Sequence, residues 1–152
     1  MGQNQFLKEA INEAKISESL DEVPVGAVIV KNNEIIARGH NLKEGMKDCT
    51  SHAEIMAIRD ASRKLDSWRL SECDLYVTLE PCAMCAGGIL NARIRKVYIG
   101  TFDSTAGACG SVINLLQNDA ISKWTEVIWL YDNECGEILT NYFKNKREGR
   151  KL

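Results

Sequence analysis

The sequence contains little proline and little histidine, and it lacks any long apolar run. Its 152 residues include two prolines and two histidines. No apolar stretch approaches the roughly 20 residues that cross a bilayer, and the N-terminus has no apolar segment typical of a secretory signal. We therefore expect a cytoplasmic protein that does not associate with a membrane.

The overall composition is that of an ordinary globular chain. Hydrophobic residues make up 45% of the sequence and charged residues 26%, which disfavours fibrous, disordered and membrane proteins. The length suits one compact domain, so residues 1–152 are expected to form a single domain. Six cysteines without a secretory signal favour reduced thiols or metal ligands over disulfides.

Charge is unevenly distributed along the chain. The net charge is −2, which does not by itself indicate a nucleic-acid-binding protein. Residues 143–152 nevertheless hold five basic groups and one acidic group, leaving 14 basic and 20 acidic groups in the rest. This basic end is able to bind phosphate groups. On charge alone, a solvated helix face is an equally good interpretation.

Hydrophobic periodicity predicts five strands and five helices in the order α-β-β-α-β-α-β-α-β-α. Strands are expected at 23–30, 34–39, 74–80, 96–100 and 125–131, and helices at 3–20, from 51 to 65, from 81 onward, at 112–116 and at 132–147. The last helix is expected to face inward through Leu139, Tyr142 and Phe143. Strands separated by helices favour right-handed crossovers. The predicted fold class is α/β, a three-layer α/β/α sandwich with a five-stranded mixed, mostly parallel sheet.

Two short motifs carry the chemistry. His52-Ala53-Glu54 and Pro81-Cys82-Ala83-Met84-Cys85 each fall at an expected helix start. This pairing of H-x-E with P-C-x-x-C is typical of zinc-dependent nucleobase deaminases. The cysteines put two sulfur atoms on one side of a helix start, where the dipole favours thiolates. With His52 they make three ligands, which leaves a position open for water as in catalytic zinc sites.

Glu54 is the candidate proton shuttle. It lies two residues from a ligand and on the apolar stripe of its helix, so we expect a partly buried carboxyl group beside the metal-activated water. Three alternatives stay open. Ser51-x-x-Glu54 also fits a capping box, and C-x-x-C alone fits a redox dithiol. A fourth ligand would make the zinc structural, and the candidates for it are Cys49, Cys73, Cys109 and Cys135.

Three segments resemble the bacterial tRNA-specific adenosine deaminases: residues 52–57, 75–87 and 107–111. The similarity runs from about Val23 to the C-terminal helix. It implies a cytidine deaminase-like fold, a homodimer, and hydrolytic conversion of adenosine to inosine at wobble position 34 of an arginine tRNA. It also implies one zinc ion per subunit, bound by His52, Cys82 and Cys85, with Glu54 as the general acid/base.

The resemblance further implies substrate contacts. Asn41 matches an asparagine that hydrogen-bonds the target base, and Val25 matches an apolar residue of the base pocket. Asp103 matches an acidic residue near the substrate backbone. Tyr142, Phe143 and the basic end match an RNA-facing C-terminal helix, so the expected partner is a tRNA anticodon stem-loop.

Two segments depart from the family pattern. Residues 104–106 read Ser-Thr-Ala where a lysine is common, and residues 48–51 read Asp-Cys-Thr-Ser where Asp-Pro-Thr-Ala is common. These departures concern how RNA is held, not the zinc motifs. An alternative enzyme, a deaminase of a free nucleobase or nucleoside such as guanine or cytosine, shares both motifs.

Overall fold

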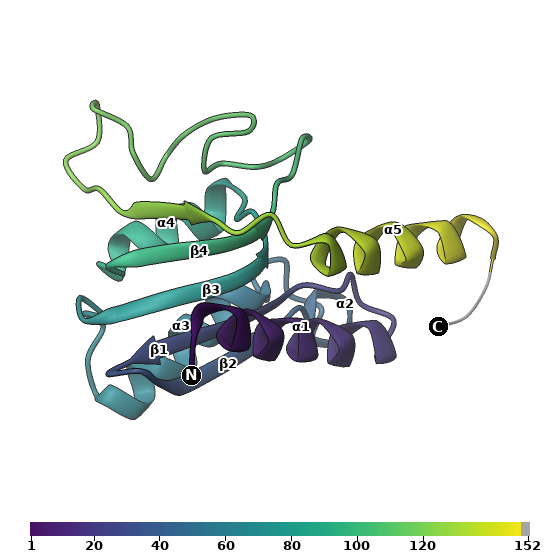
Figure 1. Cartoon of the computed structure of the whole chain (residues 1–152), viewed down its shortest axis with the longest axis horizontal. Helices are drawn as coiled ribbons and strands as arrows, with labels where there is room; N and C mark the ends of the chain where they lie inside the picture. The colour runs from purple at the N-terminus through teal and green to yellow at the C-terminus, as the bar shows by residue number, and fades with distance from the viewer. Residues whose placement is uncertain (150–152) are drawn as a thin grey trace.

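A computed structural model describes residues 1–149 of the protein as one sheet with helices on its two faces (Figure 1). Within this part of the chain, no helix combines the length and apolar character needed to span a membrane. The elements in chain order are α1 (Gln3–Ser19), β1 (Gly26–Lys31), β2 (Glu34–His40), α2 (Lys43–Met46), α3 (Ala53–Leu65), β3 (Cys73–Leu79), α4 (Ala83–Asn91), β4 (Lys96–Thr101), β5 (Glu126–Trp129) and α5 (Asn133–Arg147).

The sheet has the strand order β2-β1-β3-β4-β5. β1 pairs antiparallel with both β2 and β3, whereas β3, β4 and β5 are parallel. Four strands therefore run in one direction and β1 alone runs in the other, which confirms the expected mixed, mostly parallel sheet. The antiparallel β1–β3 pairing was not part of the prediction. Asn32 and Asn33 have φ values of 51° and 61° in the turn between β1 and β2, as a tight hairpin requires.

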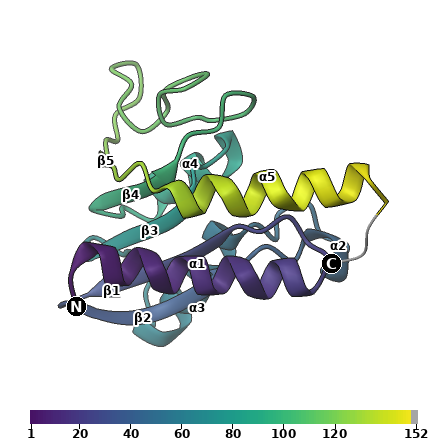
Figure 2. The ribbon, with the colours of Figure 1, turned by 45° about the vertical axis from the view of Figure 1, so that its right-hand side comes forward.

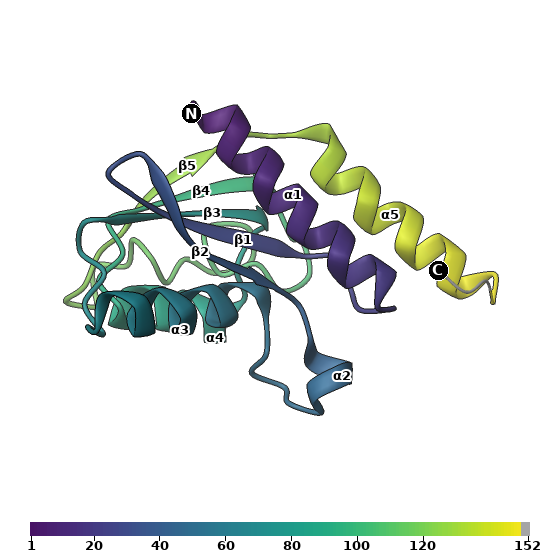
Figure 3. The same ribbon diagram turned by 90° about the horizontal axis from the view of Figure 1, so that it is seen from below.

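The helices form separate layers on the two faces of the sheet. Figure 2 and Figure 3 show α1 and α5 side by side on one face, with α3 and α4 on the other. Alternate residues of β1 pack into the two hydrophobic cores on either side of the sheet. Ala27 and Ile29 belong to the core under α3 and α4. Val28 and Val30 belong to the core under α1. Because this strand is buried on two faces, it is apolar from Gly26 to Val30.

One edge of the sheet collects the ends of several elements. β2, β3 and β4 finish at this edge, and α3 and α4 begin there. In open α/β sheets, binding sites lie beyond the carboxyl ends of the strands. The fold therefore brings the two sequence motifs to the edge where a site is expected.

Two expected details are wrong. Residues 112–116 form no helix; the segment has turns and an isolated bridge between Cys109 and Asn114. Phe143 does not face inward, because 44% of its surface is exposed. The buried residues of α5 are Cys135, Ile138 and Tyr142.

Candidate active site

α3 begins at the first motif. His52 is its N-cap residue, with extended backbone at φ −78° and ψ 156°, and Glu54 lies in the first turn. No side chain caps this helix, so the capping box of Ser51 and Glu54 is not formed. Only 4% of the surface of Glu54 is exposed. Glu54 is thus a buried carboxyl group whose position a cap does not explain.

α4 begins at the second motif in the same way. β3 ends at Leu79, and Cys82 is the N-cap residue of α4 with φ −75° and ψ 177°. Pro81, between them, cannot continue the hydrogen bonding of a central strand. Cys82 is half-buried and Cys85 is fully buried. The two motifs therefore supply their side chains from the positive ends of two helix dipoles.

The His52, Cys82 and Cys85 side chains meet at distances that fit a zinc ion. His52 Nδ1 lies 3.6 Å from Cys82 Sγ and 3.5 Å from Cys85 Sγ. Zinc bonds of about 2.3 Å to sulfur and about 2.0 Å to nitrogen, at tetrahedral angles, separate such atoms by about 3.5 Å. Within residues 1–149, no fourth His, Cys, Asp or Glu joins this cluster. A four-ligand structural site is therefore not supported.

Burial and hydrogen bonding change the acidity of the cluster. Hydrogen bonds from Cys85 and His52 lower the pKa of Cys82 to about 4, which makes the metal-binding thiolate available at neutral pH. Burial raises the pKa of Glu54 to about 7, against smaller opposing effects of hydrogen bonding and of the charge on His52. A carboxyl group with a pKa near neutrality is suited to accepting and returning a proton.

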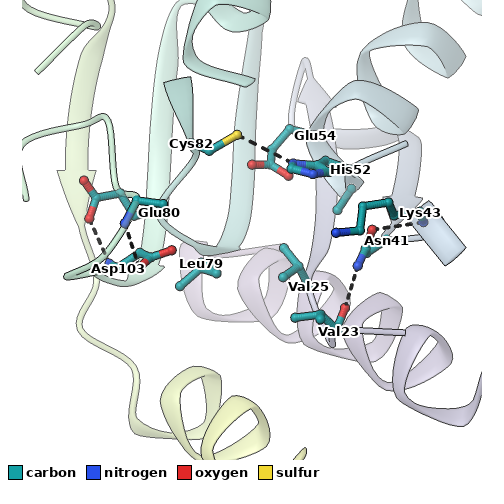
Figure 4. A pocket seen from close by; sticks show the side chains of 12 residues that line it. Val23, Val25, Asn41, Lys43, His52, Glu54, Leu79, Glu80, Cys82 and Asp103 are labelled. Carbon is teal, nitrogen blue, oxygen red and sulfur yellow. Dashed lines mark hydrogen bonds between the residues drawn. The ribbon is translucent and has the colours of Figure 1, made fainter. Parts of the chain in front are cut away.

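Two residues of the cluster, His52 and Cys82, line a pocket with a volume of about 200 Å³. Figure 4 shows the apolar side chains of Val23, Val25 and Leu79 on one side and His52 with Glu54 on the other. The full lining comprises Val23, Val25, Asn41, Lys43, His52, Ala53, Glu54, Leu79, Glu80, Cys82, Asp103 and Ala106. An apolar wall facing polar groups suits a flat, partly polar ligand such as a nucleobase.

The three predicted substrate-binding residues all line this pocket. Asn41 is 7% exposed, and its amide is fixed in orientation: Nδ2 donates to the Val23 carbonyl at 3.2 Å, and Oδ1 accepts from Lys43 N at 3.2 Å. Asp103 is partly engaged by its own loop, because Oδ1 accepts from the backbone and hydroxyl of Thr105 at 2.9 and 2.8 Å.

Six lining residues were not predicted as site residues, and two of them, Ala53 and Ala106, have only a methyl side chain. Val23 was placed in a strand that in fact begins at Gly26, and Leu79 was placed only as part of a strand, which ends at this residue. Lys43 lies in a polar segment without a motif. Glu80 was taken as the end of a strand, although a charged residue between an apolar strand and a proline is a signal that could have identified it.

Two helix starts bring together three side chains that could hold a metal ion, a buried carboxyl group and an adjoining pocket. This combination is that of the deaminases with the cytidine deaminase-like fold, which are typically zinc-dependent. The redox-dithiol alternative does not explain why His52 and Glu54 lie with the cysteines.

Comparison with known proteins agrees with this class. The model of the MafB19-like deaminase family matches residues 1–147. The chain is 46% identical to the tRNA-specific adenosine deaminase of Bacillus subtilis (strain 168), over 96% of this chain and 91% of that protein. It therefore belongs to the deaminase family that contains the bacterial tRNA-specific adenosine deaminases, as the motifs predicted.

Two solved structures are also similar. A structure from work on A-to-I editing by tRNA A34 deaminases has a TM-score of 0.87 and 41% identity, and the match covers 90% of this chain and all of that one. A guanine deaminase from Bacillus subtilis has a TM-score of 0.64 and 40% identity, with coverage of 67% of this chain and 66% of that one. The first match is thus the more complete of the two.

Proposed function

We propose that this protein hydrolyses adenosine 34 of tRNA to inosine, with arginine tRNA as the substrate and one zinc ion per subunit as the cofactor. The observation that carries the chemistry is that one pocket is lined by two residues of the three-ligand cluster, His52 and Cys82, together with buried Glu54 and the oriented amide of Asn41. The choice of substrate is supported by the nearly full-length similarity to a tRNA-specific adenosine deaminase.

The reaction consumes one water and converts adenosine to inosine and ammonia. When bound by His52, Cys82 and Cys85, zinc supplies a Lewis acid that activates water. Glu54 takes one proton from the water and delivers it to N1 of adenine, where it remains in inosine. It then transfers the second proton of the water, from the new C6 hydroxyl group, to the leaving amino group. Its raised pKa suits this repeated transfer at neutral pH.

The pocket walls position the base. The Asn41 amide keeps a second N–H on Nδ2 that hydrogen-bonds the purine, because only one is used by the Val23 carbonyl. Val25 packs against the ring face, and Asp103 lies near the substrate backbone. These roles are supported by the position of all three side chains in the pocket lining.

Deamination by the zinc-loaded protein tests the proposal. The substrates are an arginine anticodon stem-loop with adenosine at position 34, the same stem-loop with adenosine elsewhere in the loop, and free guanine, adenosine and cytidine. We expect inosine only at position 34. Turnover of free guanine without turnover of the RNA would instead favour a nucleobase deaminase and overturn the substrate assignment.

The basic end of the chain is proposed to contact RNA phosphates. Lys146 is paired with Asp21 at 2.7 Å, whereas Lys144 and Arg147 are exposed on α5; the remaining basic residues of this end lie outside the described residues. Replacing Lys144 and Arg147 with alanine should weaken binding of the stem-loop. The slope of log Kd against the logarithm of the salt concentration should fall by about 1 for each lost phosphate contact.

The control for this measurement is Lys64→Ala. Lys64 is an exposed cation on α3, where it pairs with Asp60 at 3.1 Å, and it lies in the layer opposite α5 (Figure 3). Its replacement should leave the salt dependence unchanged. An unchanged slope for the α5 variant as well would remove the reason to assign the basic end to the substrate.

We propose in addition that the protein is a cytoplasmic homodimer. Large apolar side chains are exposed on α4 and on the segment between β4 and β5, and they are Met84, Phe102, Val112, Ile113 and Trp124. All six cysteines are free, as is usual in the cytoplasm. Sedimentation at micromolar concentration should give about twice the chain mass of 17.0 kDa; the mass of one chain would contradict the dimer.

A further inference from the structure

Glu80 is a buried carboxylate beside the pocket that the proposed chemistry does not use. It follows the last residue of β3 and precedes Pro81 and Cys82, and only 2% of its surface is exposed. A buried carboxylate is costly unless it is paired or hydrogen-bonded. Within the described part of the chain, no cation forms an ion pair with Glu80; its partners are hydrogen-bond donors.

Those donors all belong to the segment after β4. Glu80 Oε1 accepts from Asp103 N at 2.9 Å and from the hydroxyl of Ser111. Glu80 Oε2 accepts from Cys109 N at 2.9 Å and from Ser111 N at 3.1 Å. Each oxygen therefore has two donors, which accounts for the acceptor capacity of the carboxylate. The hydrogen bonds therefore hold the Glu80 carboxylate to this segment and leave no acceptor position for a ligand in the pocket.

The same segment packs directly on Glu80. Ala108 N donates to the Pro81 carbonyl at 2.9 Å. At Gly107, a Cβ atom would overlap the carboxyl group of Glu80, so only glycine permits this approach. Asp103, which is one of the contact points, and Ala106, which lies between two of them, line the pocket. Residues 103–111, here named the pocket loop, have no helix or strand of their own to fix them.

We propose that Glu80 is a positioning residue that holds the pocket loop in its substrate-binding conformation. The carboxylate joins this loop to the same turn that carries Cys82, so the metal-ligand cluster and the loop are fixed relative to each other. The binding that depends on this loop conformation is that of the RNA strand on either side of the target base. This part of the proposal rests on the proposed function. The effect of Glu80 on the order of the pocket loop does not depend on the proposed function.

Three variants test the role. Glu80→Gln keeps the shape but replaces an acceptor oxygen with a donor, and Ser111→Ala removes one donor from the loop side. Asp74→Asn is the matched control, because Asp74 is a 9% exposed carboxylate at the other end of β3, paired with Arg95 at 2.8 Å. Each is measured for amide exchange over residues 101–115, for metal content, for the cobalt-substituted absorption spectrum, and for stem-loop KM and kcat.

We expect Glu80→Gln to speed exchange at Cys109 and Ser111 by about tenfold or more, because charge-assisted hydrogen bonds are lost. KM should rise by a similar factor, while kcat, metal content and the cobalt spectrum change little. Ser111→Ala should show the same pattern more weakly, and Asp74→Asn should match the wild type in loop exchange and KM.

Unchanged exchange in Glu80→Gln would overturn the proposal, as would a loss of kcat at unchanged KM, which would indicate proton transfer. If Glu80→Gln does not fold, Ser111→Ala decides, and unchanged exchange and KM in that variant overturn the proposal. If the wild type does not act on RNA, the proposed function fails, but the exchange measurement still decides whether Glu80 orders the loop.

Discussion

Glu54 is the residue on which the proposed chemistry depends most directly. Replacing it with glutamine should lower turnover of the stem-loop by about 10²–10⁴-fold, which is the usual contribution of a general acid/base. Zinc content should stay unchanged, because the three cluster residues do not include Glu54. Initial rates and metal analysis of the purified variant measure the two effects.

A second carboxylate of α3 serves as the control. Asp60 is partly exposed and pairs with Lys64, so Asp60→Asn should keep wild-type turnover and zinc. Substantial turnover by Glu54→Gln would rule out Glu54 as the proton shuttle, even if the zinc assignment stands.

At the scale of single residues, the sequence predicted those whose role follows from their chemistry. His52, Cys82 and Cys85 were predicted from ligand type and spacing, and the structure brings them together. Lys43 was not predicted, because it enters the pocket only through the folding of the segment after β2, and no local pattern in the sequence encodes that arrangement. Glu80 was not predicted either, although its place between an apolar strand and a proline is a local signal.

Helices of this fold lie very close to the sheet at particular glycines. A Cβ atom at Gly39 of β2 would overlap the carbonyl of Ala53 and lie 2.6 Å from Ala57 N, so β2 and α3 would have to separate. We expect Gly39→Ala to lower the free energy of unfolding by at least about 1–3 kcal/mol, as overpacking does. Urea unfolding followed by circular dichroism measures the change.

Gly136→Ala is the matched substitution in a place with room. The nearest atom to a Cβ there is Thr101 Oγ1 at 3.8 Å, an ordinary contact. Because alanine is favoured over glycine within a helix, this change should be neutral or stabilising by about 0.5–1 kcal/mol. Equal stability of the two variants would show that the β2–α3 contact relaxes without cost.

At the scale of elements, strong periodicity predicted well and short segments did not. The helix expected at 112–116 is absent because its apolar residues do not share a buried side: Val112 and Ile113 are exposed, whereas Leu116 is fully buried. The one-turn helix α2 was not predicted. Its amides at Glu44 and Gly45 are held by the buried carboxylate of Glu22 at 2.9 and 2.6 Å, a contact distant in the sequence.

For the whole molecule, the turn after α1 is tied to the last helix. Lys146 Nζ lies 2.7 Å from Asp21 Oδ2, and the Tyr142 hydroxyl donates to the carbonyl of Asp21 at 3.2 Å. The hydrogen bond with Lys146 lowers the pKa of Asp21 and raises the pKa of Lys146. This ion pair is exposed to solvent, so its contribution to stability should be small and sensitive to salt.

The pH dependence of this contribution follows from the two shifts. The stabilisation from Asp21 is present above its unfolded pKa of about 3.9 and is lost as the pH falls through the lower folded value. The stabilisation from Lys146 is present below its unfolded pKa of about 10.4 and is lost as the pH rises through the higher folded value. The ion pair is therefore fully effective between about pH 4 and pH 10.

Lys146→Met should accordingly lower the melting temperature slightly at pH 7. The difference from wild type should disappear near pH 2 and shrink in about 1 M salt. Lys144→Met, on the same helix but outside this contact, is the control and should change little. A difference that is constant across pH would mean that Lys146 acts through packing of its methylene groups instead.

α1 and α5 run in the same direction on one face of the sheet (Figure 2). α1 runs toward the end of the sheet at which the pocket lies, so the N-terminus lies toward the opposite end of the sheet (Figure 3). The C-terminal end of α5 extends beyond the pocket end of the sheet (Figure 3). A second protein fused to this one would therefore have different surroundings at the N-terminus and at the end of α5. Fused at the N-terminus, it would lie away from the pocket. Fused after α5, it would lie near the proposed RNA contact of this helix and would there restrict which nucleotides can reach the pocket.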